Sequence, residues 1–156
     1  MSPPLVFMMG QAPAFLPTDR VYAKNHMWAV AVEGGYRFGL SAYAVRLLGE
    51  MRHVKWSVAE GTMIRRGQPV GYVEASKATS DLYTPMSGVF VQRNENVVAD
   101  PKLINSDLYE AAWLFRITGG GETFLSPHEY LTHVETSWPL AQRMLKAQVS
   151  NPKNRD

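Results

Sequence analysis

The sequence predicts a mostly β protein, a small barrel or sandwich made of one domain. Apolar residues alternate along short stretches, as in Trp28, Val30 and Val32, which is typical of strands with one buried face. Glycine and proline separate these stretches at short intervals, which is typical of the turns in small barrels and sandwiches. The 156 residues are 46% hydrophobic, and this length and composition suit a single unit with its own core.

The predicted elements follow one another closely. The expected strands span residues 28–33, 36–40, 51–58, 68–74, 78–83, 88–92 and 112–118. The first two flank Gly34-Gly35, which favours a hairpin. Ser41 is placed to cap a short helix over residues 42–48, and Gly49 stands where a helix commonly ends in a left-handed residue.

The C-terminal part has a different pattern, which predicts helices that cover the barrel. Residues 126–129 combine a serine, a first-turn proline and a glutamate in the third position after the serine, which together form a capping box. We expect a second helix to start at Ser137-Trp138-Pro139, with an apolar stripe formed by Leu140, Met144 and Leu145. The polar residues 150–156 are expected to fray.

The first twenty residues are expected to be a flexible extension, although residues 5–9 are apolar enough to dock on the body or on a partner. They contain four prolines and lack the basic start and unbroken apolar run of a secretory signal. Elsewhere no stretch approaches the roughly 20 apolar residues that a spanning helix requires. The sequence therefore predicts a cytoplasmic protein without a membrane partner.

Composition excludes several classes of function. A formal charge of +2 is too small to indicate a nucleic-acid-binding surface. The absence of cysteine excludes disulfides, thiol nucleophiles and thiolate metal sites. The four histidines, at positions 26, 53, 128 and 133, lack metal-ligand spacing, and the glycines at 119–121 lack the lysine of a phosphate-binding loop. We therefore expect no metal and no active site.

Lys77 is the most informative residue. It lies at the centre of residues 73–81 with a predicted strand on each side, and Gly67 and Gly88 are placed almost symmetrically around it. A lysine at the tip of a hairpin points into water, where a modifying enzyme and then several partner enzymes can reach it. On spacing alone an unmodified surface lysine is the commoner interpretation.

Several separate segments, in order, resemble one family, the H proteins of the glycine cleavage system. They are Asn25–Trp28, Gly39–Ala44, Leu48–Glu50, Glu74–Asp81, Pro85–Gly88, Asn94-Glu95, Pro101, Leu103–Asn105, Tyr109, Trp113-Leu114 and, at the terminal helix, Leu125-Ser126 with Glu129-Tyr130. The resemblance covers roughly residues 22–134. It divides the chain into an extension over residues 1–20, an H-protein-like lipoyl-carrier domain over residues 21–136, and a helical extension with a polar tail over residues 137–156.

The resemblance implies a hybrid barrel-sandwich fold, as in biotinyl and lipoyl carriers, and lipoic acid attached covalently to Lys77. Biotin sites resemble a lysine flanked by methionines. Here Ser76 and Ala78 flank Lys77, which favours lipoate over biotin. Glu74 and Asp81 are candidate marks for a lipoate-attaching enzyme or contacts of the arm, and ordinary solvated charges are an equally open alternative. The implied protein is a monomeric carrier and not an enzyme.

The implied partners are a glycine decarboxylase, an aminomethyltransferase and lipoamide dehydrogenase, with the arm carrying an aminomethyl group. One departure from the family pattern leaves this open. Met27 replaces a glutamate that in H proteins helps hold the amine on the arm, Ala42 replaces a common aspartate and Tyr43 a histidine, while Asp81 is retained. A thioether cannot pair with an ammonium and prefers to be buried. The alternatives are an H-like lipoate-binding protein that carries sulfur intermediates with heterodisulfide-reductase-like sulfur-oxidation enzymes, and an unmodified interaction module.

Overall fold

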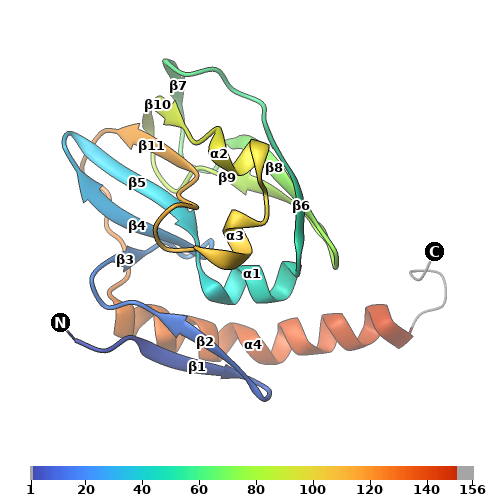
Figure 1. Cartoon of the computed structure of the whole chain (residues 1–156). Helices are drawn as coiled ribbons and strands as arrows, with labels where there is room; N and C mark the ends of the chain where they lie inside the picture. Colours follow the sequence, from blue (N-terminus) through green and yellow to red (C-terminus); the bar gives the residue numbers. More distant parts are fainter. Residues whose placement is uncertain (1, 151–156) are drawn as a thin grey trace.

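The computed structural model describes residues 2–150, with side chains described through residue 144. Within these residues, two curved sheets enclose one core (Figure 1). The larger sheet has the strand order β3 (Val21–Tyr22), β4 (Met27–Val32), β5 (Gly35–Leu40), β11 (Phe115–Thr118), β10 (Gly88–Arg93) and β7 (Thr62–Ile64). The smaller has the order β6 (Met51–Trp56), β8 (Pro69–Ala75) and β9 (Thr79–Tyr83). All pairings within them are antiparallel.

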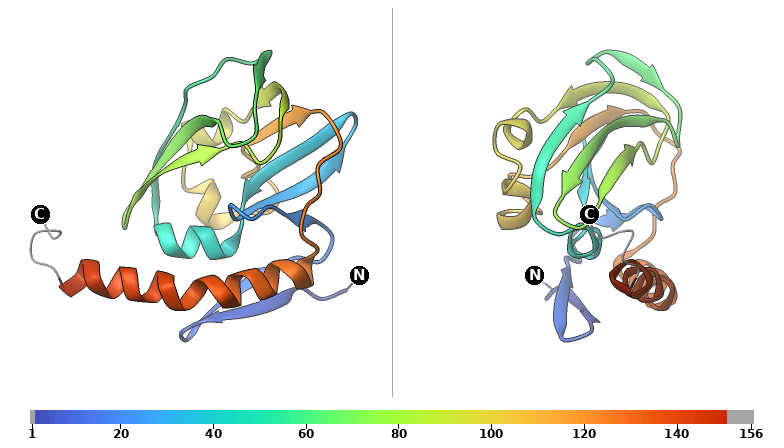
Figure 2. Two further views of the ribbon diagram at one scale, coloured as in Figure 1. Left: turned by 180° about the vertical axis from the view of Figure 1, so that it is seen from behind. Right: turned by 90° about the vertical axis from the view of Figure 1, so that its right-hand side faces the viewer.

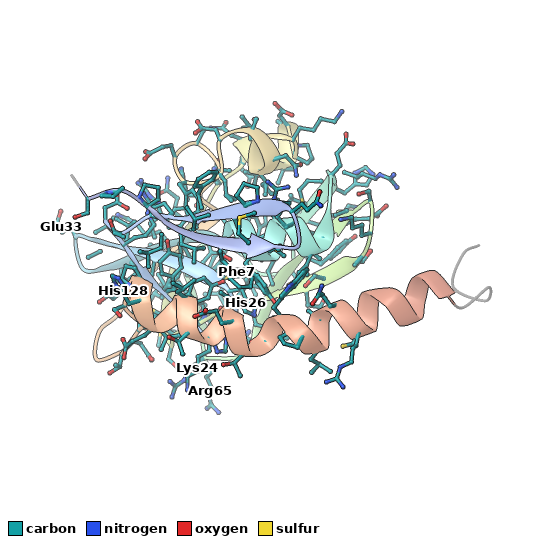
Figure 3. The ribbon with its side chains drawn as sticks, turned by 90° about the horizontal axis from the view of Figure 1, so that it is seen from below. Phe7, Lys24, His26, Glu33, Arg65 and His128 are labelled. Atoms are coloured by element: carbon teal, nitrogen blue, oxygen red, sulfur yellow. The ribbon has the colours of Figure 1, made fainter. Side chains whose placement is uncertain are left out.

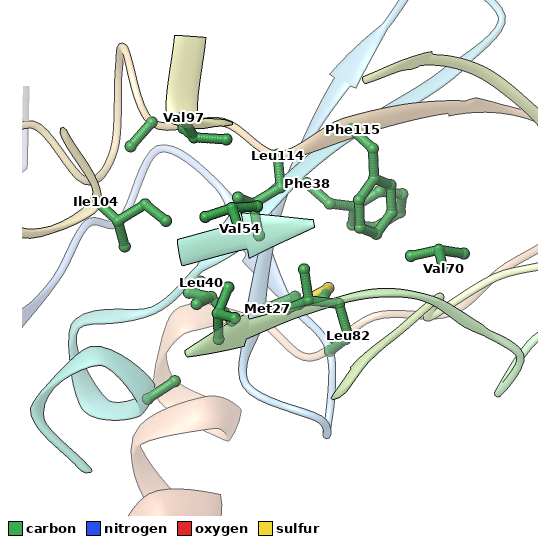
Figure 4. Packing of buried hydrophobic residues seen from close by; sticks show 14 of the residues in the cluster. Met27, Phe38, Leu40, Val54, Val70, Leu82, Val97, Ile104, Leu114 and Phe115 are labelled. Carbon is green, nitrogen blue, oxygen red and sulfur yellow. The ribbon is translucent and has the colours of Figure 1, made fainter. Parts of the chain in front are cut away.

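The core between the sheets is aliphatic and aromatic, with Phe38, Phe90 and Phe115 in contact at ring-centroid distances of 5.5 Å for Phe38–Phe115 and Phe90–Phe115. Figure 4 shows the same cluster, in which Met27 lies beside Leu40 and Leu82. Alternation along the strands places these side chains inward, and burial of this apolar surface is the main stabilising contribution. The predicted mostly β barrel-sandwich is confirmed.

Short helices connect strands of the two sheets. Helix α1 (Ala42–Leu48) has the predicted bounds, and the Ser41 hydroxyl accepts a hydrogen bond from the Ala44 amide. Two one-turn helices, α2 (Asn96–Ala99) and α3 (Leu103–Ser106), lie between β10 and β11 and were not predicted. Each is too short for a hydrophobic period to be visible in the sequence.

The opening segment differs from the expectation of a loose extension. Strands β1 (Leu5–Met9) and β2 (Ala12–Leu16) form an antiparallel hairpin around Gly10, whose φ is +66°. Alternate residues Phe7 and Met9 of β1 are buried with Ala14 and Leu16 of β2. Burial of this apolar face against the body orders the segment, and docking on the body is the part of the expectation that the structure shows.

The hairpin packs beside the C-terminal helix on the underside of the barrel, as the right-hand view of Figure 2 shows. Figure 3 looks onto this side and labels Phe7 and His26 where the hairpin and the helix meet. Phe7 lies 6.0 Å from Tyr43 and 6.2 Å from Trp138, measured between ring centroids. The terminal segments thus share a second hydrophobic cluster with the face of α1 that turns away from the barrel core.

The two predicted C-terminal helices are in fact one, α4 (Pro127–Ser150), with Pro139 inside it. The capping box is present, because the Ser126 amide donates to Glu129 Oε1 at 2.8 Å and the Glu129 amide donates to Ser126 Oγ at 3.1 Å. Proline removes one hydrogen bond from a helix interior, and packing of Trp138 against the hairpin offsets that loss. Leu140 and Met144 are exposed, and the side chain of Leu145 and residues 151–156 lie outside the described part.

None of the helices in residues 2–150 combines the length and the apolar character needed to cross a bilayer.

Candidate functional site at the Lys77 hairpin

Lys77 lies at the tip of the β8–β9 hairpin, which projects from the body as predicted (Figure 1). The Ala75 amide donates to the Ala78 carbonyl at 2.9 Å, so residues 75–78 form a tight turn with Ser76 and Lys77 at its centre. The Lys77 side chain is exposed, and its Nζ donates to the Arg46 carbonyl at 3.3 Å. Among the described ion pairs, none includes Lys77.

Three hydrogen bonds tie this turn to the connection between α1 and β6. The Lys77 amide donates to the Leu48 carbonyl at 2.9 Å, the Ser76 amide donates to the Glu50 carbonyl at 2.8 Å, and the Glu50 amide donates to Ser76 Oγ at 2.9 Å. Asn105 of α3 supports the connection from behind, because its side chain donates to the Gly49 carbonyl at 3.0 Å. The backbone of Lys77 is therefore held in one position, while its side chain lies exposed at the surface.

Gly49 permits this close approach. It ends α1 with φ +94°, a conformation that side chains disfavour, and a Cβ at this position would collide with Ser76 Oγ and lie 3.2 Å from Lys77 Cγ. The side chain of Lys77 thus runs across the unsubstituted face of Gly49 toward Arg46.

Gly49→Ala is expected to lower the free energy of unfolding by about 1–3 kcal/mol, the usual cost of strained backbone at such a position. It should also slow modification of Lys77, because the turn has to move away from the new methyl group. Urea denaturation and a time course of modification measure the two effects. Gly61→Ala is the matched control, since Gly61 also has positive φ, +91°, and meets open space. Equal rates of Lys77 modification in Gly49→Ala and Gly61→Ala would contradict the role of Gly49 in positioning Lys77.

Glu74 and Asp81 lie on the outer face of the same hairpin. Glu74 pairs with Thr79 and Asp81 with Tyr72, so the two carboxylates occupy diagonal positions on neighbouring strands. The Tyr83 hydroxyl donates to Asp81 Oδ2 at 3.3 Å, and Asp81 is exposed. The structure thus brings both acids to the hairpin near Lys77 without pairing either with its amine.

A cavity of about 200 Å³ lies on one side of α1, lined by Met27, Leu82, Asp81 and their neighbours. Met27 is only 2% exposed, so its thioether belongs to the hydrophobic core, as predicted, and Figure 4 shows it beside Leu40 and Leu82. Tyr43 is buried in the second hydrophobic cluster, which the N-terminal hairpin shares with α1 and α4. Neither residue offers a charge to this cavity, and Asp81 is the acid in its described lining.

A larger groove, of about 500 Å³, lies on the other side of α1, and we call it the hairpin groove. It is lined by Pro13, Phe15, Ala42, Val45, Arg46, Gly49, Lys77, Ile104, Asn105, Leu108 and Tyr109. Lys77 stands at its edge and contributes to its lining, whereas it does not line the Met27 cavity. The two hollows flank α1, and the lysine side chain is directed toward the larger.

Comparison with known proteins identifies the family. The family model described as "Glycine cleavage H-protein" matches residues 20–136. A glycine cleavage system H protein from Alcanivorax borkumensis is 33% identical over 125 residues, covering 78% of this chain and 97% of that protein. One from Streptomyces coelicolor is 38% identical over 117 residues, covering 73% and 93%. The chain belongs to the glycine cleavage H-protein family.

The H-protein fold is shared as well as the sequence. A crystal structure of a glycine cleavage system H protein from Mycobacterium marinum matches with a TM-score of 0.68 at 29% identity, covering 78% of this chain and 98% of that one. The resemblance predicted from the segments around Lys77 is thereby confirmed at the level of family and fold. The β1–β2 hairpin lies before the first residue that the H-protein model matches.

Sequence reasoning missed the groups that hold the turn of this H-protein family member. The Arg46 and Leu48 carbonyls, the Ser76 hydroxyl and the Asn105 amide are backbone or small polar groups with no distinctive spacing. Phe15 was missed because residues 1–20 were expected to be loose. The signal that was present is Gly10-Gln11 between two apolar runs, which is typical of a two-residue hairpin turn.

Proposed function

We propose that the protein is a lipoyl carrier, with lipoic acid attached through an amide to Lys77. In this role it carries an aminomethyl group between a glycine decarboxylase, an aminomethyltransferase and lipoamide dehydrogenase. The observation that carries the proposal is an exposed amine on a turn whose backbone is fixed by α1, in a chain of the H-protein family. We propose no active site of its own.

The residues around Lys77 fit an acylated amine. Amide formation removes the ammonium charge, and no described carboxylate loses an ion-pair partner when this happens. The acylated Nζ keeps one N–H, which suffices for the hydrogen bond to the Arg46 carbonyl. When attached, the lipoyl group supplies a dithiolane that opens and closes by thiol-disulfide exchange.

Glu74 and Asp81 are proposed as the marks that a lipoate-attaching enzyme reads. Both lie on the outer face of the hairpin, and Asp81 is also in the lining of the Met27 cavity. The turn presents its lysine with these acids on the two strands that lead to it. An enzyme that grips the hairpin therefore contacts both acids on the strands that lead to the lysine.

Two measurements test the carrier proposal. Co-expression with a lipoate ligase and lipoate should add one lipoyl group to the intact mass, located at Lys77 by peptide mapping. The modified protein should then support exchange between bicarbonate and the carboxyl group of glycine by glycine decarboxylase. Failure to gain the mass would refute the carrier role, and a mass gain without exchange would refute the glycine partners alone.

One observation favours a second function, transport of sulfur intermediates for heterodisulfide-reductase-like enzymes. The thioether of Met27 is buried where H proteins are expected to place an acid. The cavity therefore lacks one carboxylate that would pair with an ammonium. An arm that carries sulfur needs no such partner. If the modified protein supports a sulfur-oxidation assay but does not support glycine exchange, this second function is the correct one.

Met27→Glu tests whether the thioether at this position weakens glycine exchange. The substitution should raise glycine exchange about tenfold, because a charge-assisted hydrogen bond to the ammonium contributes about 1.5–3 kcal/mol. It should also lower the free energy of unfolding by about 3 kcal/mol, since a carboxylate enters a buried position without an established partner. Exchange kinetics and urea denaturation measure both effects. Met27→Gln is the control, with the same length and no charge, and equal exchange by the two variants would contradict this account of Met27.

A further inference from the structure

The hairpin groove has a wall that belongs to the N-terminal hairpin. Residues alternate along β2, so Ala14 and Leu16 are buried against the body while Pro13 and Phe15 face the groove. Phe15 is 50% exposed, an unusual degree for a phenylalanine on an ordered strand. Its exposed ring is therefore available to something that enters the groove.

This wall is held at a fixed distance from α1. An Arg46 guanidinium nitrogen donates to the Pro13 carbonyl at 3.0 Å, and the Tyr109 hydroxyl donates to the Phe15 carbonyl at 2.7 Å. The same Tyr109 oxygen accepts a hydrogen bond from the Ala42 amide at 2.9 Å. Both anchors use backbone carbonyls of β2, so the Phe15 ring itself stays free, and the groove is preformed.

The lining of the groove suits a neutral and mostly apolar occupant. Its described side chains include six apolar groups, a phenol, an amide and two cations, and none is a carboxylate. A cationic guest would meet Arg46 without any opposite charge. Aromatic rings also make favourable contacts with sulfur, and Phe15 and Tyr109 supply two such rings.

Size distinguishes the two hollows beside α1. The hairpin groove measures about 500 Å³, within the roughly 300–1,000 Å³ typical of small-molecule pockets. The Met27 cavity measures about 200 Å³, below that range. Lys77 lines the hairpin groove and does not line the Met27 cavity. Its Nζ already donates a hydrogen bond to the Arg46 carbonyl on the side of the groove.

We propose that the hairpin groove is a docking site for the neutral lipoyl arm of Lys77, with Phe15 of the N-terminal hairpin as its outer wall. This inference rests on the carrier function proposed above. The occupant is tethered at the edge of the groove, so docking needs no second molecule, and its effective concentration there is high. Docking lowers the fraction of time that the disulfide of the arm is open to solvent, and partner enzymes have to draw the arm out of the groove.

The rate of chemical reduction tests the proposal. Protein carrying one lipoyl group, verified by intact mass, is treated with tris(2-carboxyethyl)phosphine for set times and trapped with iodoacetamide. The chain has no cysteine, so each reduced arm gains two carbamidomethyl groups without a background from other thiols. Phe15→Ala should raise the reduction rate about threefold to tenfold, because the docked fraction falls when the wall is removed.

Matched variants keep the test specific. Val6 pairs with Phe15 across the hairpin and is 46% exposed, yet it does not line the groove, so Val6→Ala should leave the rate unchanged. Leu108→Ala, on the opposite wall, should raise it as Phe15→Ala does. Circular dichroism establishes that all variants are folded.

The outcomes separate the two proposals. Equal reduction rates for wild type, Phe15→Ala and Leu108→Ala, each with the lipoyl mass present, would overturn the docking site and leave the carrier function intact. An equal increase in Val6→Ala would also overturn it, since loosening of the hairpin would then explain the effect. Absence of the lipoyl mass in wild type would remove the carrier function and the docking site together.

Discussion

Lys77→Arg is expected to abolish lipoyl attachment and, with it, all glycine exchange above background. Acylation needs an amine that can lose its proton, whereas the guanidinium of arginine stays protonated and does not act as a nucleophile in proteins. The substitution keeps the positive charge and can still donate to the Arg46 carbonyl, so the turn is preserved. The free energy of unfolding should stay within about 0.5 kcal/mol of wild type, as for most exposed positions. Intact mass, exchange kinetics and urea denaturation measure these three quantities.

The control for this substitution is another exposed lysine on the same sheet. Lys55 lies on β6 and is exposed, so Lys55→Arg should retain the lipoyl mass and full exchange. A lipoyl group found on any residue of Lys77→Arg would show that the ligase reads a different site. Loss of attachment in Lys55→Arg would indicate that the ligase reads the charge pattern of the sheet and not the position of one amine.

Local rules were sufficient to predict the parts of the fold that depend on neighbouring residues. The cap at Ser41 and the capping box at Ser126 and Glu129 appear as expected, because each motif satisfies backbone groups within one turn. Helix α1 also ends at Gly49 as expected, although the φ of +94° and ψ of −149° there are not those of a left-handed helical residue. The β8–β9 hairpin followed from the strands on either side of Lys77. These features need no knowledge of the tertiary structure.

The features that the sequence analysis missed depend on contacts between distant segments. The prolines in residues 1–20 predict a flexible segment, yet the β1–β2 hairpin is ordered because Phe7 packs against Tyr43 and Trp138. Pro139 predicts a helix start, yet α4 continues through it because Trp138 is held by the same cluster. The hairpin groove requires β2, α1 and the segment after α3 to meet, and no local pattern specifies that meeting.

The same cluster places a histidine in an environment that disfavours its charge. His26 packs against Tyr43 at 4.8 Å and faces His133 of α4 at 5.3 Å, measured between ring centroids. Its Nδ1 lies 2.9 Å from the Tyr130 hydroxyl, which in turn lies 2.7 Å from Ser41 Oγ. Burial first, and the nearby His133 second, lower the pKa of His26 from 6.5 to about 4. The neutral ring is therefore the form that joins α4 to the start of α1.

Acidification is expected to weaken this junction in a defined pH range. The folded-state pKa of His26 is lower than its unfolded value, so its contribution to stability is complete above pH 6.5 and is lost as the pH falls toward about 4. Between pH 7 and 4.5 the free energy of unfolding should fall by about 2–3 kcal/mol more in wild type than in His26→Asn. Asparagine tolerates the positive φ of +71° at this position, and His128→Asn, at an exposed site, should follow the wild-type profile. Urea denaturation at a series of pH values gives the three profiles, and parallel curves for wild type and His26→Asn would show that His26 takes up its proton without cost to the fold.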